Sequence, residues 1–548
     1  MKTKMLMLCA AAALIPAAVN AQDFDPTNTY GASAAQVEAD VRFLADDLLE
    51  GREAGTRGYD IAAAYVASRF AALGLEPAGP DGGWYQQATF RTATLDAAKS
   101  SVALVRGGQE IALDASQALP RPSLAATEVG MEAPLVFVGR GIDAPELGHD
   151  DYAGIDVTGK IVVYISDVPS DLGPDYQGHI SGSRAKMAAK HGAIGTIGIS
   201  PAPADRAQRI FDFFSSRPST SWAGEDGRNG ALPDGMQMSI QVSPTGAAAL
   251  MEGAPVTLDQ LMEMTRAGDA LPKFELPGRL KATAVSTFED FTSPNVMAKI
   301  EGADPEQRDE YMVMVAHLDH VGHNENAKPG EDAIYNGALD NAAGVATMLE
   351  AARLFAETEG DARPDRSVLF IAVTAEEKGL LGAEYFAAYP TVPLENIVAD
   401  LSLDMPVPLY EFTDVVAFGS EHGTMEDYIA EAGASMGITL SPDPMPEQAI
   451  FVRSDHYVFA QEGIPAVLLF TGYGNGGEPI WADFFANRYH KPGDDLTQDF
   501  HWNALARYAA LNFRIASAIA EDDDRPLWYE GNYFGNAFAP DAEKAPAK

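Results

Sequence analysis

Histidine and carboxylate side chains recur along the chain in short strings whose spacing suits metal chemistry. These strings are His317-Leu318-Asp319, Asp340-Asn341, Glu376-Glu377, Asp404 and His490. The two histidines and three of these carboxylates would suit a pair of borderline-soft divalent ions, above all zinc, with one carboxylate bridging the ions. Two ions about 3.5–4 Å apart can hold a water or hydroxide between them and polarise a carbonyl group. These residue types therefore predict a hydrolytic site with two divalent metal ions.

The adjacent carboxylates Glu376 and Glu377 predict a division of labour. One would bind metal while its neighbour takes a proton from the attacking water, because separate environments can hold two carboxylates in different roles. Asp319 is placed to accept the second N–H of the His317 imidazole and to fix its tautomer. Each string alone has an ordinary explanation: a surface loop, an acidic helix start or, for Asp340, a helix N-cap. Their joint occurrence is what indicates a metal site.

The strings fall where apolar segments of strand length end. We expect buried strands over 311–316, 367–374, 397–403 and 466–470, and helices over 342–355, 383–388, 425–436 and 502–520. Strands that alternate with helices predict a mostly parallel sheet covered on both faces. Ligands of such sheets bind beyond the carboxyl ends of the strands, which is where the strings lie. The expected fold class is therefore α/β, with three layers around a mixed, mainly parallel sheet.

The pattern changes along the chain in a way that predicts an inserted domain. Helices are expected over 40–50 and 59–73, whereas short β-like stretches follow at 101–105, 135–138 and 161–165. A β-rich domain inserted into the α/β domain is the simplest account. The predicted organisation is a signal peptide over 1–21, the first part of the catalytic domain over 22–96, the insert over 97–278, the main part of the catalytic domain over 279–525, and a partly disordered C-terminal tail over 526–548.

Composition excludes some functions and predicts export. The chain has 38 Lys and Arg against 79 Asp and Glu, which argues against a nucleic-acid partner because phosphate contacts need clustered cations. Lys2 and Lys4 precede an apolar run that contains the single cysteine, Cys9, and small residues up to Ala21 suit cleavage by a signal peptidase. We therefore expect a periplasmic or extracellular protein without thiolate ligands, and with no membrane span.

The metal-site strings together resemble a known family. In chain order the sequence reads A-H-L-D, G-A-L-D-N-A-A-G, A-E-E-K-G-L-L-G, L-D-M-P and Y-H-K-P-G-D. These strings resemble the zinc exopeptidases that include aminopeptidase Y, glutamate carboxypeptidase and the catalytically inactive transferrin receptor. The N-terminal string F-L-A-D-D-L-L-E-G-R-E-A-G-T-R-G is also similar to that family, and residues 150–163 resemble its inserted protease-associated domain.

The resemblance implies a role for each residue of the set. His317 and Asp404 would hold one zinc ion, Glu377 and His490 the other, and Asp340 would bridge them. Glu376 would be the general base, and the Asp340–Asn341 peptide bond would be cis. Because the ligand set is complete, the resemblance favours an active enzyme over a receptor-like member or a single-zinc glutaminyl cyclase.

A later segment is expected at the substrate pocket, and it leaves alternatives open. Its members are Arg453, Ser454, Asp455, His456 and Tyr457, while Trp481 and Phe485 are further candidates. His320 and His323 are assigned to a loop. The expected function is a secreted aminopeptidase that acts on peptides with a free N-terminus, through a metal-bridging hydroxide and Glu376. The alternatives are a carboxypeptidase or dipeptidase, for which Arg453 would bind the substrate carboxylate, and a non-catalytic binding protein.

Overall fold

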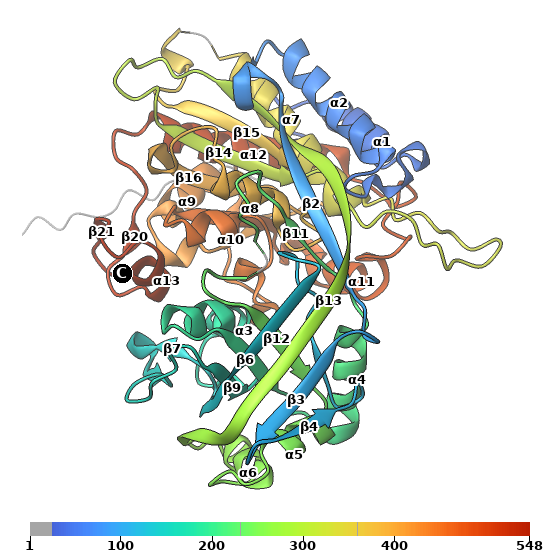
Figure 1. Cartoon of the computed structure of the whole chain (residues 1–548). Coiled ribbons are helices and arrows are strands. Elements are labelled where there is room, and N and C mark those ends of the chain that lie inside the picture. The colour runs from blue at the N-terminus through green and yellow to red at the C-terminus, as the bar shows by residue number, and fades with distance from the viewer. Residues whose placement is uncertain (1–24, 231, 359) are drawn as a thin grey trace, which may run out of the picture.

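One long strand, β13 (Lys273–Ile300), organises the computed structural model, which describes residues 25–230, 232–358 and 360–548 (Figure 1). The predicted signal peptide, 1–21, lies outside the described residues. The C-terminal half of β13 pairs with β2 (Tyr85–Leu95) and β15 (Ser367–Val373). Its N-terminal half pairs with β3 (Ser101–Arg106) and β6 (Glu128–Val138) in a second sheet. The same strand therefore belongs to both parts of the molecule.

The first sheet carries the strands that the sequence predicts. β14 (Tyr311–His317) lies parallel to β15 and to β16 (Ile397–Ser402), and β16 is parallel to β19 (Ala466–Thr471). β13 and β2 add antiparallel strands beyond β15, and β17 (Asp414–Phe418) adds one beyond β19. Every residue of β14, β15, β16 and β19 is buried, as expected of central strands in a parallel sheet. The mixed, mainly parallel α/β sheet is thus confirmed.

Two groups of helices flank this sheet. α1 (Ala34–Leu44), α7 (Ala343–Ala356) and α12 (Trp502–Glu521) pack on one another, and α7 and α12 also contact β14. α8 (Leu381–Ala388) and α10 (His456–Gln461) pack together and contact β2, β13, β16 and β19. The remaining helices of this part are α2 (Arg57–Ala72), α9 (Met425–Ser435) and α11 (Gly477–Asp483).

The helix expected over 40–50 is wrong in its bounds. α1 ends at Leu44, and a separate 3₁₀ segment (Asp47–Arg52) follows it. Glu50, Gly51 and Arg52 have φ values of 49°, 73° and 48°, which a continuing helix cannot accommodate. The Cβ of any larger residue at Gly51 would lie 2.4 Å from the Gly322 carbonyl oxygen, so the turn also requires a glycine for close packing. This turn carries Arg52 into the interior.

The segment between β2 and β13 has a hydrophobic core of its own, which includes Leu104, Phe137, Val163, Ile197 and Ile240. Its strands are β3, β4 (Gln109–Leu113), β5 (Ala118–Pro120), β6, β9 (Ile161–Ile165), β10 (Gly195–Ile199) and β12 (Met238–Val242). Its helices are α3 (Pro174–Lys190), α4 (Ala204–Ser215), α5 (Pro244–Leu250) and α6 (Leu258–Ala267). We call this segment the insert; its kinship with protease-associated domains stays a prediction.

β11 (Ser219–Trp222) lies within the predicted insert boundaries, but it leaves the insert sheet. It pairs with β2 in the first sheet, with Ser219 opposite Ala93 and Trp222 opposite Phe90. Because β13 runs antiparallel to β15, the N-terminal half of β13 extends beyond the carboxyl ends of the parallel strands. The insert that β13 carries therefore lies beyond the edge of the sheet where ligands are expected.

The C-terminal segment over 526–548, expected to be partly disordered, forms β20 (Trp528–Tyr529), α13 (Tyr533–Phe538) and β21 (Lys544–Ala545). The side chain of Phe534 is fully buried, and Trp528 Nε1 donates a hydrogen bond of 2.8 Å to the Gly463 carbonyl. The expectation was based on the Ala-, Pro- and charge-rich composition at the end of the tail, and it gave too little weight to these aromatic anchors. None of the described helices combines the length and apolar character needed to cross a bilayer.

Candidate metal centre

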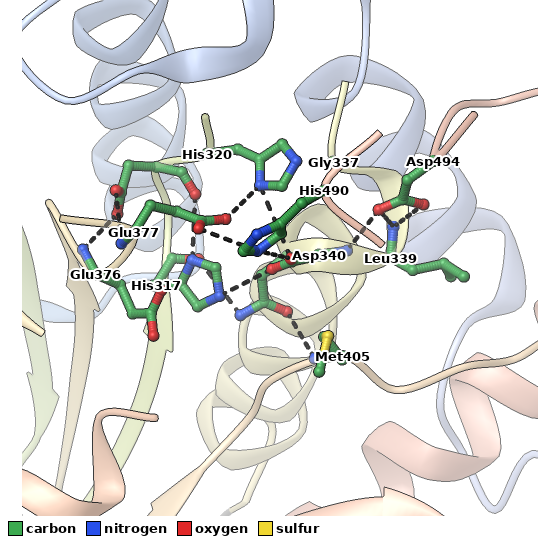
Figure 2. Close-up of polar contacts among 12 residues, drawn as sticks. His317, His320, Gly337, Leu339, Asp340, Glu376, Glu377, Met405, His490 and Asp494 are labelled. Carbon is green, nitrogen blue, oxygen red and sulfur yellow. Dashed lines mark hydrogen bonds and ion pairs between the residues drawn. The ribbon is translucent and has the colours of Figure 1, made fainter. Parts of the chain in front are cut away.

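The predicted metal-site residues converge at the carboxyl ends of three parallel strands, and Figure 2 labels all of them except Asp404. His317 ends β14, the Glu376-Glu377 pair lies in the turn after β15, and Asp404 lies two residues beyond β16. Asp340 lies in the turn before α7, and His490 comes from the loop that follows residues 484–488. The topology of the sheet thus gathers groups that are far apart in sequence.

The donor atoms form two groups that share Asp340. His317 Nε2 lies 3.1 Å from Asp404 Oδ1 and 3.3 Å from Asp340 Oδ1. His490 Nε2 lies 3.1 Å from Glu377 Oε2 and 3.2 Å from Asp340 Oδ2. Ligand atoms around a tetrahedral zinc ion, with bonds of about 2.0–2.1 Å, lie about 3.3 Å from one another. The donor set and its spacing therefore fit two divalent ions, with one oxygen of Asp340 directed toward each.

The charge of this centre points to the same conclusion. Burial opposes a charge on His490, but its contacts with Asp340 and Glu377 raise its pKa to about 10. Burial likewise opposes a charge on His317, yet the carboxylates of Asp404 and Glu376 raise the pKa of that imidazole well above its ordinary value. Buried carboxylates at this density require positive charge beside them. Divalent cations would supply it.

His317 is held in the tautomer that a metal ligand needs. Its Nδ1–H donates a hydrogen bond of 3.1 Å to the backbone carbonyl of Asp319, which leaves the Nε2 lone pair facing the carboxylates. We expected the side chain of Asp319 to accept this proton, and that detail is wrong. The Asp319 carboxylate instead accepts hydrogen bonds from the backbone amides of Glu376 and Glu377, at 3.1 and 3.4 Å. It thereby fixes the turn that carries the two glutamates.

Glu376 is suited to take up a proton. Its side chain borders the small cavity beside the centre and is half-buried. Burial, and beyond it the charges of Asp455, Glu377 and Asp404, raise the pKa of Glu376 well above its ordinary value. A carboxylate with a raised pKa is an effective general base.

The turn around Asp340 adopts the backbone that the family resemblance implies. The Asp340–Asn341 peptide bond is cis. The Asn341 side chain donates to the Leu403 carbonyl at 2.9 Å and accepts from the backbone amide of Gly344 at 3.0 Å. It therefore ties the start of α7 to the segment after β16.

His320 lies in the centre, whereas the sequence assignment placed it in a loop. Its Nδ1 donates a hydrogen bond of 2.6 Å to Glu377 Oε1 and lies 3.9 Å from Asp340 Oδ2. The side chain is buried, and its Nε2 has no hydrogen-bond partner among the described residues. His323, the other histidine of that assignment, is exposed. The sequence assignment weighed position in the family alone, and it overlooked that His320 follows the same strand as His317.

Two further buried side chains support the centre. Asp494 accepts hydrogen bonds from the backbone amides of Leu339 and Asp340, each at 3.0 Å. Arg52 donates to the backbone carbonyls of Leu318, Asn336 and Gly337. These contacts hold the backbone just after His317 and the backbone on both sides of Asp340's turn, at residues 336–340. Neither role was predicted, although Asp494 follows His490 in the quoted string and Arg52 lies in the N-terminal one.

A small cavity opens beside the centre, lined on its apolar side by Met405, Ile450, Leu468, Phe470, Phe485 and Tyr489. Of the predicted pocket segment, Arg453 and Ser454 line this cavity, and the Ser454 hydroxyl donates a 2.8 Å hydrogen bond to Asp404 Oδ2. The next three residues do not line it. Asp455 and His456 are buried, and the hydroxyl of Tyr457 lies 2.5 Å from His179 Nδ1 of the insert. Phe485 lines the cavity as expected, whereas Trp481 is fully buried in the core.

A mainly parallel α/β sheet that gathers histidines and carboxylates at one edge is the arrangement expected of a metal-dependent hydrolase. Residues 295–516 match the model described as Peptidase family M28. The matched segment contains all the metal-site strings, so the match agrees with the zinc-exopeptidase resemblance that those strings indicate.

Curated relatives and a solved structure are similar to parts of this chain or to most of it. The chain is 34% identical over 231 residues to a probable zinc metalloprotease of Pyrenophora tritici-repentis, covering 39% of this chain and 49% of the relative. It is 28% identical over 250 residues to a probable leucine aminopeptidase 2 of Aspergillus oryzae, covering 42% and 46%. The chain therefore spans about half the length of these relatives. An aminopeptidase from Aneurinibacillus sp. strain AM-1 is similar over 95% of this chain and 99% of its own, at 19% identity and a TM-score of 0.45.

Proposed function

We propose that this protein is an exported aminopeptidase that uses two divalent metal ions, which we take to be zinc, and that removes the N-terminal residue of peptides. The observation that carries the proposal is the placement of Asp340, whose two oxygens face His317 and His490 respectively. The names of similar proteins, a zinc metalloprotease and a leucine aminopeptidase, support the choice of metal and of reaction.

The chain's own residues divide the work as follows. His317 and Asp404 would hold one ion, Glu377 and His490 the other, and Asp340 both. Bound ions supply Lewis acidity that polarises the scissile carbonyl and makes water more acidic. Glu376 takes a proton from the attacking water and delivers it to the leaving amine. Asp319 keeps Glu376 in place through its backbone amide.

The cavity beside the centre supports an aminopeptidase over the carboxypeptidase alternative. Its apolar wall suits the side chain of an N-terminal residue, and its acidic residues suit a free ammonium group. Arg453 is the one lysine or arginine among the residues that line it, and this residue is exposed. A carboxypeptidase would need that cation to bind the terminal carboxylate.

An assay with matched substrates tests the proposal. Aminoacyl arylamides with a free amine, their N-acetylated forms and N-blocked peptides with a free carboxylate would be compared, each with and without a chelator. We expect turnover of the free-amine substrates alone, with loss on chelation and recovery on adding zinc. Turnover of the N-blocked peptides alone would establish the carboxypeptidase. Absence of both turnover and bound metal would favour the non-catalytic binding protein.

Export and the role of the insert complete the proposal. We infer cleavage after Ala21, followed by release into a periplasm or the medium, from the apolar run that contains Cys9. The mass of the mature N-terminal peptide tests this site directly. We further propose that the insert is a protease-associated domain that limits access to the centre; its position beyond the carboxyl edge of the sheet supports this role.

A further inference from the structure

A second cavity, of about 520 Å³, lies between the insert and the turn that carries the catalytic glutamates. The catalytic domain contributes Lys378 and Gly379 from that turn, together with Leu381 and Glu384 of α8. The facing wall comes from the insert, from residues 121–124 and from 214–221. We call this space the basic pocket.

The charges of the basic pocket are inverted relative to the chain. Carboxylates outnumber cations about twofold in the whole sequence, yet the pocket is lined by Arg121, Arg217 and Lys378 against a single acidic residue, Glu384. Lys378 is paired with Glu53 at 2.7 Å, so the positive charge left for a ligand is that of the two arginines. Desolvation raises the pKa of Glu384, which favours its uncharged form. A local excess of positive charge in an acidic protein indicates an anionic ligand.

The two arginines have no carboxylate partner within the described part of the chain. Arg121 donates to the Phe214 carbonyl at 2.9 Å and to the Ser219 hydroxyl at 2.6 Å. The guanidinium carbon of Arg217 lies 3.9 Å from the centroid of the Phe213 ring, and the residue is exposed. Since Arg binds carboxylates through a planar fork of donors, both side chains are prepared for an acidic group.

A buried hydroxyl gives an independent indication of a ligand. Ser221 lines the pocket, its side chain is buried, and its Oγ has no hydrogen-bond partner among the described residues. Buried hydroxyls are rarely left without a partner. Phe214, which is 46% exposed, adds an apolar surface at the mouth.

The order of strands places the basic pocket and the apolar cavity on opposite sides of the metal centre. The apolar cavity uses the ends of β16 and β19, with Met405, Leu468 and Phe470. The basic pocket uses the turn after β15, and β14 with His317 lies between β15 and β16. A peptide whose first side chain occupies the apolar cavity therefore crosses the centre toward β15 and the insert.

The distance that such a peptide must span can be estimated from the sheet. From β16 to β13 there are three strand spacings of about 4.8 Å, or about 14 Å across the sheet. Lys378 Nζ lies 5.9 Å from the ring centroid of Phe291. Phe291 is four residues along β13 from Asn295, which lies level with the end of β15, and this rise is also about 14 Å. Lys378 follows Glu377 directly, so the near end of the pocket adjoins the centre. The end beside the insert, where Arg121 contacts Ser219 opposite Ala93 and thus near Phe288, lies roughly 20 Å or more away, a distance that about six extended residues span.

We propose that the basic pocket is a distal subsite that binds a carboxylate of the peptide substrate, about five to eight residues beyond the scissile bond. This inference rests on the proposed function and names its substrate class: polypeptides with an acidic residue, or their own C-terminus, at that distance. Arg121 and Arg217 pair with the carboxylate, while Phe214 covers the adjoining backbone.

A positional scan tests the subsite. The substrates are decapeptide amides that begin with leucine and carry one glutamate at successive positions, each compared with its glutamine counterpart. Free-acid and amide peptides of seven residues form a second arm, which separates a C-terminal carboxylate from a side chain. Leucine arylamide, too short to reach the pocket, serves as the reference substrate. The readout is kcat/KM for release of leucine.

For the wild type, we expect glutamate at positions six to nine to raise kcat/KM about fivefold over glutamine, as for exposed charge pairs. The preference should fall below twofold in Arg121→Gln/Arg217→Gln, with leucine arylamide unchanged. Arg209→Gln, on helix α4 shortly before Arg217 but paired with Asp205 and outside the pocket, is the matched control and keeps the preference. Arg217→Gln alone, at an exposed position, tests the proposal if the double variant does not fold.

Either of two results would overturn the subsite: no glutamate position that raises kcat/KM in the wild type, or a preference that survives in the double variant. If the proposed function is wrong, the result is different: neither the wild type nor any variant would hydrolyse leucine arylamide. In that event, fluorescence anisotropy still measures the affinity of the wild-type protein for labelled glutamate and glutamine decapeptides. Equal affinities for the two peptides would overturn the subsite.

Discussion

Asp340 directs its two carboxylate oxygens toward two different histidines: Oδ1 lies 3.3 Å from His317 Nε2, and Oδ2 lies 3.2 Å from His490 Nε2. If each oxygen binds one ion, replacing Asp340 weakens both positions at once. For Asp340→Ala we expect less than one metal ion per chain, against two in the wild type, by elemental analysis of the dialysed protein. Asp309→Asn, at an exposed position, is the control. Full occupancy in Asp340→Ala would refute the bridging role.

Glu376→Gln separates metal binding from proton transfer. The side chain keeps its shape but cannot accept the proton, so we expect kcat to fall by about 10²–10⁴ with metal content unchanged. Arylamide kinetics and elemental analysis of the same preparation measure both. Undiminished turnover of Glu376→Gln would show that Glu376 is not the general base.

His320→Gln tests the contact between His320 and Glu377. Because His320 Nδ1 donates to Glu377 at 2.6 Å, its loss frees the glutamate and should weaken the ion at Glu377 and His490 about tenfold. Chelator titration should then remove one ion at a lower chelator concentration than the other. His323→Gln, at an exposed position of the same loop, should leave the titration unchanged. Equal behaviour of the two variants would show that His320 does not support the centre.

Asp175, at the start of α3, makes stability depend on pH. Burial, together with the charges of Glu421 and Asp443, raises its pKa to about 7. A carboxyl whose pKa is raised on folding stabilises the protein fully below its unfolded value near 4, and this contribution is lost as pH rises toward 7. Asp175→Asn should therefore be more stable than the wild type by about 1 kcal/mol at pH 8, after allowance for solvent screening, and should show no gain at pH 4. Urea unfolding at both pH values measures this, with Asp171→Asn as the exposed control; a gain that is equal at the two pH values would contradict it.

Phe534 tests whether the C-terminal segment contributes to stability. Its ring is fully buried and stacks with Phe538 at a centroid distance of 5.8 Å. Phe534→Ala should cost about 3–5 kcal/mol in the free energy of unfolding. Lys548→Ala, which removes only partly exposed ion pairs with Glu426 and Asp427, should cost less than about 1 kcal/mol. Similar losses in the two variants would argue against a packing role for Phe534.

The strands and the candidate ligands were predictable because their signals are local. Apolar runs such as 311–316 match β14 almost residue for residue, and polar groups at strand ends must meet when the strands are parallel. The helices were less certain, since α1 ends early to allow the left-handed turn at Glu50 and Gly51. That turn places Arg52 so that it reaches the backbone carbonyls of Leu318 and Asn336, hundreds of residues away, besides that of Leu44 nearby.

Hydrogen bonds between side chains and distant backbone groups, such as those of Arg52, cannot be predicted from a sequence pattern. The chain indicates that Asp319 lies near His317, but not that its carbonyl rather than its carboxylate meets the imidazole. In the same way, nothing in the string around His490 shows that Asp494 holds the amides of Leu339 and Asp340. Such contacts depend on side-chain direction in the folded protein, which spacing alone leaves open.

The continuity of β13 has a mechanical consequence. The chain enters the insert from β2 and returns along β13, and these two strands pair from Leu95 opposite Ser286 to Tyr85 opposite Val296. Swinging the insert away from the centre would therefore bend a continuous 28-residue strand and break ladder hydrogen bonds, instead of flexing a loop. The insert is therefore joined to the catalytic domain by a continuous, paired strand and not by a flexible loop.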